Sequence, residues 1–324
     1  MLNNKSLIDD MNLMGKNREP FLFILDFSLN DPVLLPLNKA AKHDIWYFMD
    51  GNTNYSNNYQ KTTEVKFVKI PVDYEVFKRA FDHVMKNIEY GNSFLTNLTF
   101  PTEIETNLTL EEIFERSDAP YRLLYKDKFV VFSPELFVRI SGNQIAAFPM
   151  KGTINAAIPD ASAKILNDPK ETAEHHTIVD LIRNDLSMVA NDVQVKRFRY
   201  IDEIITHEKK LLQVSSEVTG TLPDNYHENL GEIICKLLPA GSISGAPKCK
   251  TLQIINEVET YKRGYYTGVF GIFDGKDVES AVMIRFIENI AGKMVYKSGG
   301  GITVFSNPED EYNEMIDKVY VPIN

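Results

Sequence analysis

The alternation of apolar and polar positions along the chain predicts strands and helices in an irregular order. Residues 21–28 and 44–49 are nearly continuous apolar runs of strand length, and an Asn-rich loop is expected at 51–60. From 73 to 91 apolar residues recur at helical spacing, with an aspartate as the predicted N-cap and a glycine as the predicted stop. Short apolar runs broken by turn residues between 94 and 150 are typical of an antiparallel sheet.

The second half of the chain mixes further helices with strands. Helices are predicted at about 169–190, 226–237, 246–258 and 308–319, and strands at 264–273, 278–287 and 293–297, the last two joined by a turn at Gly292. Strands and helices that do not strictly alternate favour an α+β fold, with two mixed or antiparallel sheets flanked by helices, over a doubly wound parallel sheet. Residues 1–70 are expected to form a short amino-terminal part of the sheet scaffold and 71–324 the catalytic region, in one compact unit, although the length also allows two domains.

Composition narrows the classes of function. The 324 residues are 44% hydrophobic and carry a net charge of −10, the wrong sign for a protein that binds the phosphate backbone of nucleic acids. The first 20 residues lack a signal-peptide pattern and no 18-residue apolar run follows, so we expect a cytoplasmic protein without a membrane segment. Two cysteines, Cys235 and Cys249, cannot build a disulfide framework or a Cys-rich zinc site.

Two predicted helix starts share one pattern, in which a capping residue and a proline precede acidic side chains. Each start carries a pair of glutamates three residues apart: Glu171 and Glu174 after Asp168-Pro169, and Glu311 and Glu314 after Asn307-Pro308. Acidic residues in a first helical turn also complement the helix dipole, so either helix alone has a purely structural explanation. If the two helices faced each other, charges 4 Å apart would repel by roughly 4 kcal/mol at an effective dielectric of 20. Such a cluster needs a cation, and carboxylates alone point to Mg²⁺.

Two glycine-containing segments are candidates for binding anions. The segment 237–248 (LLPAGSISGAPK) resembles a phosphate loop, but its glycines and its lysine do not have the spacing of a nucleotide-binding loop. A helix predicted to begin at Ala246 could still receive a carboxylate on its free N–H groups. Residues 298–301 (SGGG) predict either an anion-binding nest or an ordinary tight turn.

Two further residues could carry chemistry if they are enclosed. Lys151 follows a predicted strand, where an isolated lysine is ordinarily solvated. Held in a closed site near a divalent cation, its amine could lose a proton and act as a nucleophile. Glu135 has an equally ordinary default as a turn carboxylate, but burial would raise its pKa and suit it to be a general acid.

Taken together, these segments resemble the chorismate-utilising enzymes, a family that includes anthranilate synthase component I, aminodeoxychorismate synthase component I, isochorismate synthase and salicylate synthase. The matching motifs are SPELF at 133–137, PMKGT at 149–153, ETAEHHTIVDLIRNDL at 171–186, LLPAGSISGAPK at 237–248, RGYYTGVFG at 263–271, MIRF at 283–286 and SGGGITVFSNPEDEYNE at 298–314. The first 70 residues match weakly and look shorter than the family's usual amino-terminal part.

The resemblance implies an anthranilate synthase component I-like fold and a specific reaction. Lys151 distinguishes the chain within the family, because aminodeoxychorismate synthases resemble P-I-K-G-T here and anthranilate synthases P-I-A-G-T. Lys151 would attack C2 of chorismate while Glu135 protonates the departing C4 hydroxyl. Ammonia would then attack C4, giving 4-amino-4-deoxychorismate for 4-aminobenzoate and folate synthesis.

The resemblance also implies ligands for the metal and the substrate. Mg²⁺ would be held, directly or through water, by Glu171, Glu174, Glu311 and Glu314, and the substrate would be contacted by Thr153, Tyr266, Arg285 and the backbone around Gly245 and Gly300. An arginine suits this task because a planar guanidinium pairs with a carboxylate through two hydrogen bonds. Neither cysteine lies in a G-x-C-x-G elbow, so ammonia is expected from a separate glutamine amidotransferase subunit.

Two departures from the family pattern keep alternatives open. Leu95 stands where the water-using members carry a lysine and the amine-using members a glutamine, and Gln213 stands where the family usually has a histidine. The lack of a lysine at 95 weighs against hydroxylation by water. The alternatives are anthranilate synthase component I and a non-catalytic subunit that binds chorismate.

Overall fold

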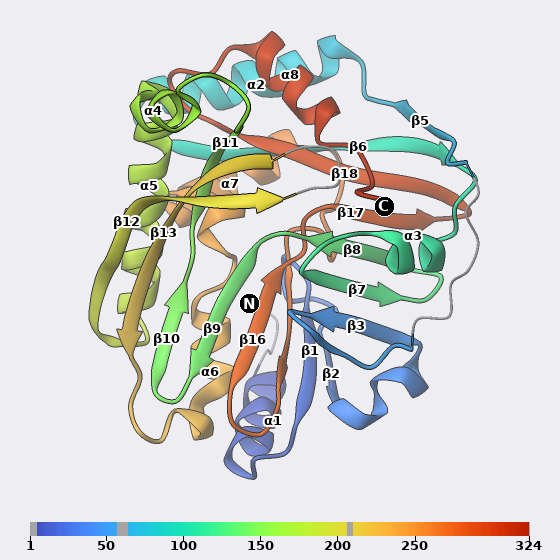
Figure 1. The fold of residues 1–324 in the computed structure, drawn as a ribbon, viewed down its shortest axis with the longest axis vertical. Coiled ribbons are helices and arrows are strands. Elements are labelled where there is room, and N and C mark those ends of the chain that lie inside the picture. The colour runs from blue at the N-terminus through green and yellow to red at the C-terminus, as the bar shows by residue number, and fades with distance from the viewer. Residues whose placement is uncertain (1–4, 57–63, 206–209, 324) are drawn as a thin grey trace.

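The strands form two antiparallel sheets, A and B, in the computed structural model, which describes residues 5–56, 64–205 and 210–323 (Figure 1). Sheet A contains, in spatial order, β11 (Met150–Asn155), β13 (Lys210–Thr221), β10 (Gln144–Ala147), β9 (Leu136–Ser141), β16 (Val278–Val282), β15 (Val269–Phe273), β1 (Phe21–Leu25) and β2 (Val33–Pro36), with β12 (Asn191–Ile205) paired to β13. Sheet B contains β14 (Gly245–Ala246), β6 (Leu95–Thr106), β18 (Lys293–Ile302), β17 (Phe286–Ile290), β8 (Phe129–Ser133), β7 (Tyr121–Tyr125), β3 (Ile45–Met49) and β4 (Asn52–Thr53), with β5 (Phe67–Ile70) paired to β6. The predicted α+β fold is confirmed.

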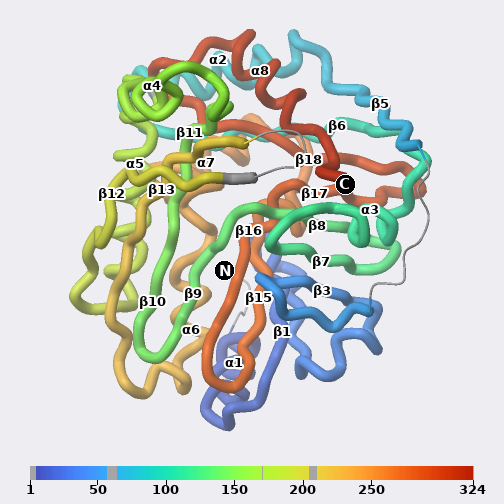
Figure 2. The backbone as a smooth tube through the Cα atoms, in the orientation of Figure 1, coloured from blue at the N-terminus to red at the C-terminus, as the bar shows by residue number. Residues whose placement is uncertain are grey.

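Helices cover the outer faces and the ends of the sheets, as the backbone trace in Figure 2 also shows. They are α1 (Lys5–Lys16), α2 (Tyr74–Glu89), α3 (Leu110–Arg116), α4 (Ala161–Asn167), α5 (Pro169–Ser187), α6 (Leu230–Lys236), α7 (Lys248–Val258) and α8 (Pro308–Asp317), with 3₁₀ turns η1 (Leu37–His43), η2 (Tyr226–Asn229) and η3 (Gly241–Ile243). Helix α5 packs on β12 and β13, α1 packs on α6, and α2 contacts β6, α7 and α8. None of the helices in the described parts of the chain combines the length and the apolar character needed to cross a bilayer.

Most of the predicted elements are present, with differences at their edges. Helix α2 begins after Asp73, whose side chain accepts a hydrogen bond from the Glu75 N–H as predicted. Helices α1, α3 and α4 were not predicted, and residues 57–60 of the predicted Asn-rich loop lie outside the described residues. The helix expected from 246 begins at Lys248, because Gly245 and Ala246 instead form β14 and pair with β6.

Sheet A is buried on both faces, which explains the continuous apolar run of β1. Alternate side chains of a strand point to opposite faces. Phe21, Phe23 and Leu25 therefore pack in the core between sheet A and the helices α1, α5 and α6. Leu22 and Ile24 pack in a second core against β3, β7 and β8 of sheet B. This second core fixes the two sheets against each other.

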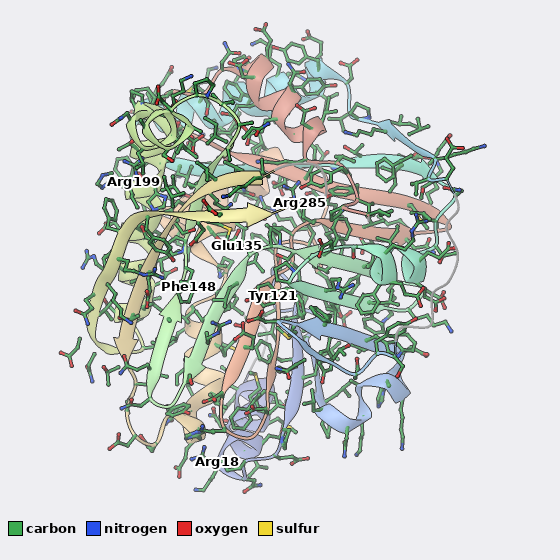
Figure 3. All side chains as sticks on the ribbon, in the orientation of Figure 1. Arg18, Tyr121, Glu135, Phe148, Arg199 and Arg285 are labelled. Atoms are coloured by element: carbon green, nitrogen blue, oxygen red, sulfur yellow. The ribbon has the colours of Figure 1, made fainter. Side chains whose placement is uncertain are left out.

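The chain crosses from one sheet to the other at two neighbouring places. Strand β8 of sheet B continues into β9 of sheet A through Pro134 and Glu135, and β16 of sheet A continues into β17 of sheet B through residues 283–285. The single strand predicted at 278–287 is therefore wrong. The backbone turns at Arg285, which has a positive φ of 52°, and the two crossings are joined by hydrogen bonds from the Val282 N–H to the Glu135 carbonyl and from the Phe132 N–H to the Arg285 carbonyl. Figure 3 shows Glu135 and Arg285 at this junction between the sheets.

Candidate active site

A cavity of about 430 Å³ lies where the two sheets meet. Its wall is built from both crossings, β11, β18, the first turns of α5 and α8, and the loop that carries η3. The residues singled out from the sequence that line it are Glu135, Lys151, Thr153, Glu171, Glu174, Tyr266, Arg285, Gly300, Glu311 and Glu314. Gly245 does not line it, because this residue packs against β6 so closely that a Cβ atom would overlap the Leu95 carbonyl oxygen.

Lys151 points its amine into the cavity from the edge strand β11. The pairing of β11 with β13 is irregular between Lys151 and Thr153, where Gly152 has a φ of +76°. The Lys151 Nζ donates a hydrogen bond to Glu174 Oε2 at 3.0 Å. Burial lowers the pKa of Lys151, but the carboxylates of Glu174, Glu314 and Glu171 outweigh it and hold the pKa above its ordinary value. In the chain alone the amine is therefore a charged partner of the acidic cluster.

Glu135 occupies the first crossing between the sheets. Its carboxylate accepts a hydrogen bond from the Ser242 hydroxyl of η3. Burial raises the pKa of Glu135, while the Ser242 hydrogen bond and the charge of Lys151 act in the opposite direction without cancelling the effect of burial. A carboxyl group with a raised pKa facing a cavity can hold a proton for transfer, as the sequence analysis anticipated. Its role as the acid remains a prediction.

Helix α5 brings the first pair of glutamates to the cavity. The Asp168 side chain accepts a hydrogen bond from the Glu171 N–H at 2.9 Å, and Pro169 occupies the first helical turn, so the predicted cap is present. Glu174 is only 6% exposed and contacts Lys151. Glu171 Oε2 lies 3.0 Å from the position that a Cβ at Gly152 would take. Both carboxylates of the pair thus lie beside β11.

Helix α8 brings the second pair to the same cavity. The Asn307 side chain caps the helix by accepting from two backbone N–H groups. Glu311 is 3% exposed, and its Oε1 accepts a hydrogen bond from the Ser306 hydroxyl at 2.6 Å. Glu311 Oε2 and Glu314 Oε1 lie 3.2 and 3.8 Å from the position of a Cβ at Gly300. The two similar helix starts do meet at one cavity, as the magnesium hypothesis requires.

The donor set fits a hard cation that keeps part of its water shell. Within the described residues, no three acidic, histidine or cysteine side chains converge as a ready-made metal cage. Lys151 contacts Glu174 at 3.0 Å and Lys318 contacts Glu314 at 2.6 Å, so ammonium groups balance part of the negative charge. Mg²⁺ is commonly held by one or two carboxylates together with waters and an anionic substrate. Four carboxylates spread around one cavity suit that mode of binding, which stays a prediction here.

A cationic side chain also lines the cavity. Arg285 reaches it from the second crossing; its Nη1 donates to the Lys318 carbonyl oxygen at 2.7 Å and its guanidinium lies 4.8 Å from the centre of the Tyr320 ring. Tyr266 is 4% exposed and its ring packs against Phe286. An enclosed arginine near a tyrosine is suited to bind a carboxylate of a small ligand.

The glycines at 299–301 form neither the anion nest nor the tight turn considered from the sequence. They are part of strand β18 and pair with β6. A Cβ at Gly299 would overlap the Leu98 carbonyl oxygen, whereas Gly300 faces the glutamates of α8. The glycines are therefore required for close approach of a strand and for room in the cavity.

Among the lining residues that sequence reasoning missed, Lys318 and Ser242 contact two of the glutamates singled out from the sequence. Lys318 lies one helical turn after Glu314, and its Nζ also donates to the Gly299 carbonyl oxygen at 3.0 Å. The spacing of four from Glu314 was the available signal. Ser242 belongs to a segment whose match was noted, but nothing in its spacing indicated a contact with Glu135.

The two residues that depart from the family pattern are both near the cavity. Gln213 lines it and is paired with Thr153 across β11 and β13. Leu95 is 2% exposed. A Cβ atom placed on Gly301 would lie 2.9 Å from Leu95 Cδ1 and 3.6 Å from Lys151 Nζ. An apolar side chain therefore occupies the neighbourhood of the Lys151 amine.

Comparison with known proteins identifies related sequences. A family profile described as chorismate binding enzyme matches residues 35–324. The chain is 51% identical over 316 residues to an uncharacterized PabA-like protein of Haemophilus influenzae, covering 98% of this chain and 96% of that protein. It is 33% identical to an anthranilate synthase component 1 of Haloarcula marismortui and 30% identical to the aminodeoxychorismate synthase component 1 of Bacillus subtilis, in both cases covering 77% of this chain. The chain spans only 53% and 55% of those two longer proteins.

Solved structures share the fold. A putative 2,3-dihydroxybenzoate-specific isochorismate synthase, DhbC, from Bacillus anthracis aligns with a TM-score of 0.71 at 22% identity, covering 98% of this chain and 87% of that one. Anthranilate synthase component I from Streptococcus pneumoniae aligns with a TM-score of 0.63 at 24% identity, covering 79% and 59%. The predicted anthranilate synthase component I-like fold is confirmed.

Proposed function

The chain belongs to the family of chorismate-binding enzymes, and we propose that it converts chorismate and ammonia to 4-amino-4-deoxychorismate. The observation that carries the proposal is the placement of Lys151: its amine lies inside the cavity, on the strand end where the sequence resembles aminodeoxychorismate synthases. The relatives alone do not choose between amination products, because an anthranilate synthase and an aminodeoxychorismate synthase are similarly distant at 33% and 30% identity.

The reaction proceeds in two displacements. The charged Lys151 amine first gives up one proton, and the neutral amine then attacks C2 of chorismate; the ring double bonds shift, and the C4 hydroxyl departs as water with a proton from Glu135. Glu174, 3.0 Å from the amine, is placed to accept the proton that Lys151 loses. Ammonia then attacks C4 and passes its extra proton to the Glu135 carboxylate, the double bonds shift back, and the bond between Lys151 and C2 breaks, which releases an amine that recovers its proton from Glu174. The net change replaces one hydroxyl by one amino group and releases water.

Separate groups of residues bind the two carboxylates of chorismate. Tyr266, Arg285 and the strand at Gly300 bind the enolpyruvyl carboxylate. Glu171, Glu174, Glu311 and Glu314 would hold Mg²⁺ directly or through water, and the ion would supply positive charge for the ring carboxylate. Thr153 lies near the ring substituents. A carboxylate on each side orients the ring with C2 toward Lys151.

One feature of the chain supports amination over hydroxylation. Leu95 puts a hydrocarbon side chain beside the Lys151 amine, where a water-activating base would be needed. The nucleophile is therefore expected to be ammonia, delivered by a separate glutamine amidotransferase subunit. The product would enter 4-aminobenzoate and folate synthesis.

The test is an assay of the purified chain with chorismate, MgCl₂ and ammonium chloride at pH 8.5, followed by separation and mass analysis of the products. We expect 4-amino-4-deoxychorismate, with no product when Mg²⁺ is chelated. Free anthranilate would identify the chain as an anthranilate synthase, and isochorismate would show that water is the nucleophile. Binding of chorismate without any turnover would favour a non-catalytic subunit. Any of these three results would overturn the proposal.

A further inference from the structure

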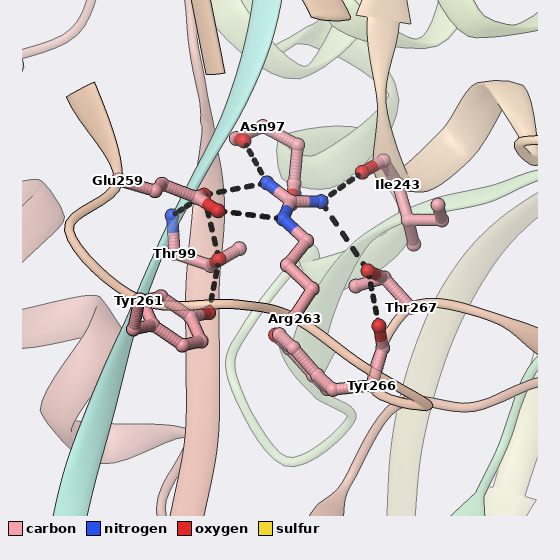
Figure 4. A network of polar contacts seen from close by, with 8 residues as sticks. All are labelled: Asn97, Thr99, Ile243, Glu259, Tyr261, Arg263, Tyr266 and Thr267. Atoms are coloured by element: carbon pink, nitrogen blue, oxygen red, sulfur yellow. Dashed lines mark hydrogen bonds and ion pairs between the residues drawn. The ribbon is translucent and has the colours of Figure 1, made fainter. Parts of the chain in front are cut away.

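A guanidinium group is enclosed directly behind the cavity wall. Arg263 is 3% exposed, and Figure 4 shows its side chain surrounded by polar partners. It makes two hydrogen bonds with Glu259, from Nε at 2.8 Å and from Nη2 at 2.6 Å. The side chains of this pair are 2% and 3% exposed, so the pair is shielded from water. A buried pair of this kind is stable only when its remaining hydrogen-bonding groups are also satisfied.

The remaining N–H groups of Arg263 bind three different segments of the chain. Nη2 donates to the Asn97 carbonyl oxygen of β6 at 2.7 Å, and Nη1 donates to the Ile243 carbonyl oxygen of η3 at 2.9 Å and to the Thr267 hydroxyl at 3.4 Å. All five N–H groups of the guanidinium therefore have acceptors. Lysine cannot reproduce this arrangement, because its ammonium group is a point charge with three donors.

Glu259 extends the network on the other side. Its Oε1 also accepts hydrogen bonds from the Thr99 N–H at 3.0 Å and from the Thr99 hydroxyl at 2.7 Å. The same hydroxyl lies 2.6 Å from the Tyr261 hydroxyl oxygen. The carboxylate is therefore fixed to β6, two residues beyond the Asn97 carbonyl that Arg263 binds. Arginine and glutamate together tie the loop at 259–267 to sheet B.

The three segments that Arg263 joins are the ones that present functional side chains to the cavity. Asn97, Ile243 and Thr267 all line it. Ile243 adjoins Ser242, the hydrogen-bond donor to Glu135, and Thr267 adjoins Tyr266. Thr267 has a φ of +61°, which is rare for a β-branched residue and needs surrounding contacts to hold it.

We propose that Arg263 is a positioning residue for the amination reaction, which fixes Ser242 and Tyr266 by joining η3, β6 and the 266–267 segment through one buried guanidinium. The inference rests on the proposed function. Arg263 does not itself line the cavity, so it acts on the substrate only through these neighbours. Displacement of η3 withdraws Ser242 from Glu135, and displacement of the 266–267 segment withdraws Tyr266 from the substrate.

The test compares Arg263→Lys with a control, Arg139→Lys. Arg139 also makes two hydrogen bonds to a glutamate, Glu279, but neither residue lines the cavity. We expect Arg263→Lys to raise the KM for chorismate at least fivefold and to lower kcat at least tenfold. Native-state hydrogen exchange of the peptides covering 240–246 and 263–268 should become at least tenfold faster. Arg139→Lys should change none of these quantities by more than twofold.

A purely structural role predicts a different result. Loss of folded protein lowers the apparent kcat in proportion to the folded fraction and leaves KM unchanged. An unchanged KM, with or without faster exchange, would therefore overturn the proposal. If Arg263→Lys does not fold, Glu259→Gln, which keeps the side-chain volume and removes the charge, is measured in the same way.

The outcome is separable from that of the proposed function. If the wild-type chain does not aminate chorismate, the proposed function fails. Titration calorimetry with chorismate, together with hydrogen exchange, then tests whether Arg263 positions the cavity wall. A fivefold weaker dissociation constant with faster exchange in the two segments supports positioning, and unchanged values refute it.

Discussion

Replacing Lys151 by methionine tests the central residue of the site. Methionine has a similar volume, so Lys151→Met removes the amine and its charge while leaving the packing of β11 nearly intact. The matched control is Lys248→Met, because Lys248 pairs with Asp185 at 2.9 Å, has 20% of its side chain exposed compared with 28% for Lys151, and does not line the cavity. Both variants remove a lysine from a largely buried ion pair.

The expected loss of stability follows from the geometry. Two unit charges 3.0 Å apart, the distance from Lys151 Nζ to Glu174 Oε2, attract by about 5.5 kcal/mol at an effective dielectric of 20. Removing one partner of a fully buried pair costs about 3–5 kcal/mol. Because 28% of the Lys151 side chain is exposed, water compensates in part, and we expect the free energy of unfolding to fall by about 2–3 kcal/mol. Lys248→Met should lose a similar amount.

The assay separates stability from catalysis. Urea unfolding gives the free energies, and ammonium-dependent turnover of chorismate is measured on the folded protein. Lys151→Met should lose at least about 1,000-fold in kcat, because a covalent nucleophile has no substitute, whereas Lys248→Met should stay within about threefold of wild type. The covalent role of Lys151 would be refuted if Lys151→Met kept more than a tenth of the wild-type kcat. It would also be refuted if the two variants lost kcat by the same factor.

Three further predictions concern the proton donor, a buried histidine and the glycine strand. Glu135→Gln should lower kcat by at least about 100-fold. Because burial raises the pKa of Glu135, the free energy of unfolding of wild type should also fall relative to that of the variant as pH rises above 4.5. Parallel pH profiles of the two proteins in urea unfolding would contradict this. Burial lowers the pKa of His175 from 6.5 to about 4, so the free energy of unfolding of wild type should fall by on the order of 3 kcal/mol as pH falls from 6.5 to 4. Thermal melts of His175→Gln should show a smaller loss of stability over the same pH range. Gly299→Ala places a Cβ against the Leu98 carbonyl oxygen and should cost at least about 2 kcal/mol in denaturant unfolding, whereas Gly300→Ala should cost less than about 1 kcal/mol. Gly300→Ala should instead raise the Mg²⁺ concentration needed for half-maximal turnover, since its Cβ would lie 3.2 Å from Glu311 Oε2. Equal stabilities of the two alanine variants would refute the assignment of Gly299 and Gly300 to different faces of β18.

The site was predictable where its chemistry depends on local sequence. A capping residue followed by proline fixes the start of a helix, so the positions of Glu171 and Glu311 in their first turns followed from a few neighbouring residues. Whether two such helices meet depends on contacts between residues more than 100 positions apart, which periodicity does not encode. The resemblance of several motifs in order indicated that they do.

The fold was least predictable where the chain changes sheets. The apolar pattern continues through 278–287 because the strands on both sides of Arg285 are buried, so it could not reveal that β16 and β17 belong to different sheets. The glycines of β18 were misread for a related reason. Their small size serves close contact with β6, a neighbour in space that local turn chemistry cannot anticipate.

The order of strands also constrains how the protein can be divided. β1 lies beside β15 in sheet A, and β18 lies between β6 and β17 in sheet B, so each sheet combines early and late parts of the chain. No single cut yields a fragment that contains one whole sheet. During synthesis on the ribosome, β6 can pair only with β5 until β14 and β18 have emerged, and the cavity acquires the carboxylates of α8 only after that. The two sheets are thus expected to fold as one cooperative unit, and co-expressed halves of the gene would have to reassemble both sheets to recover activity.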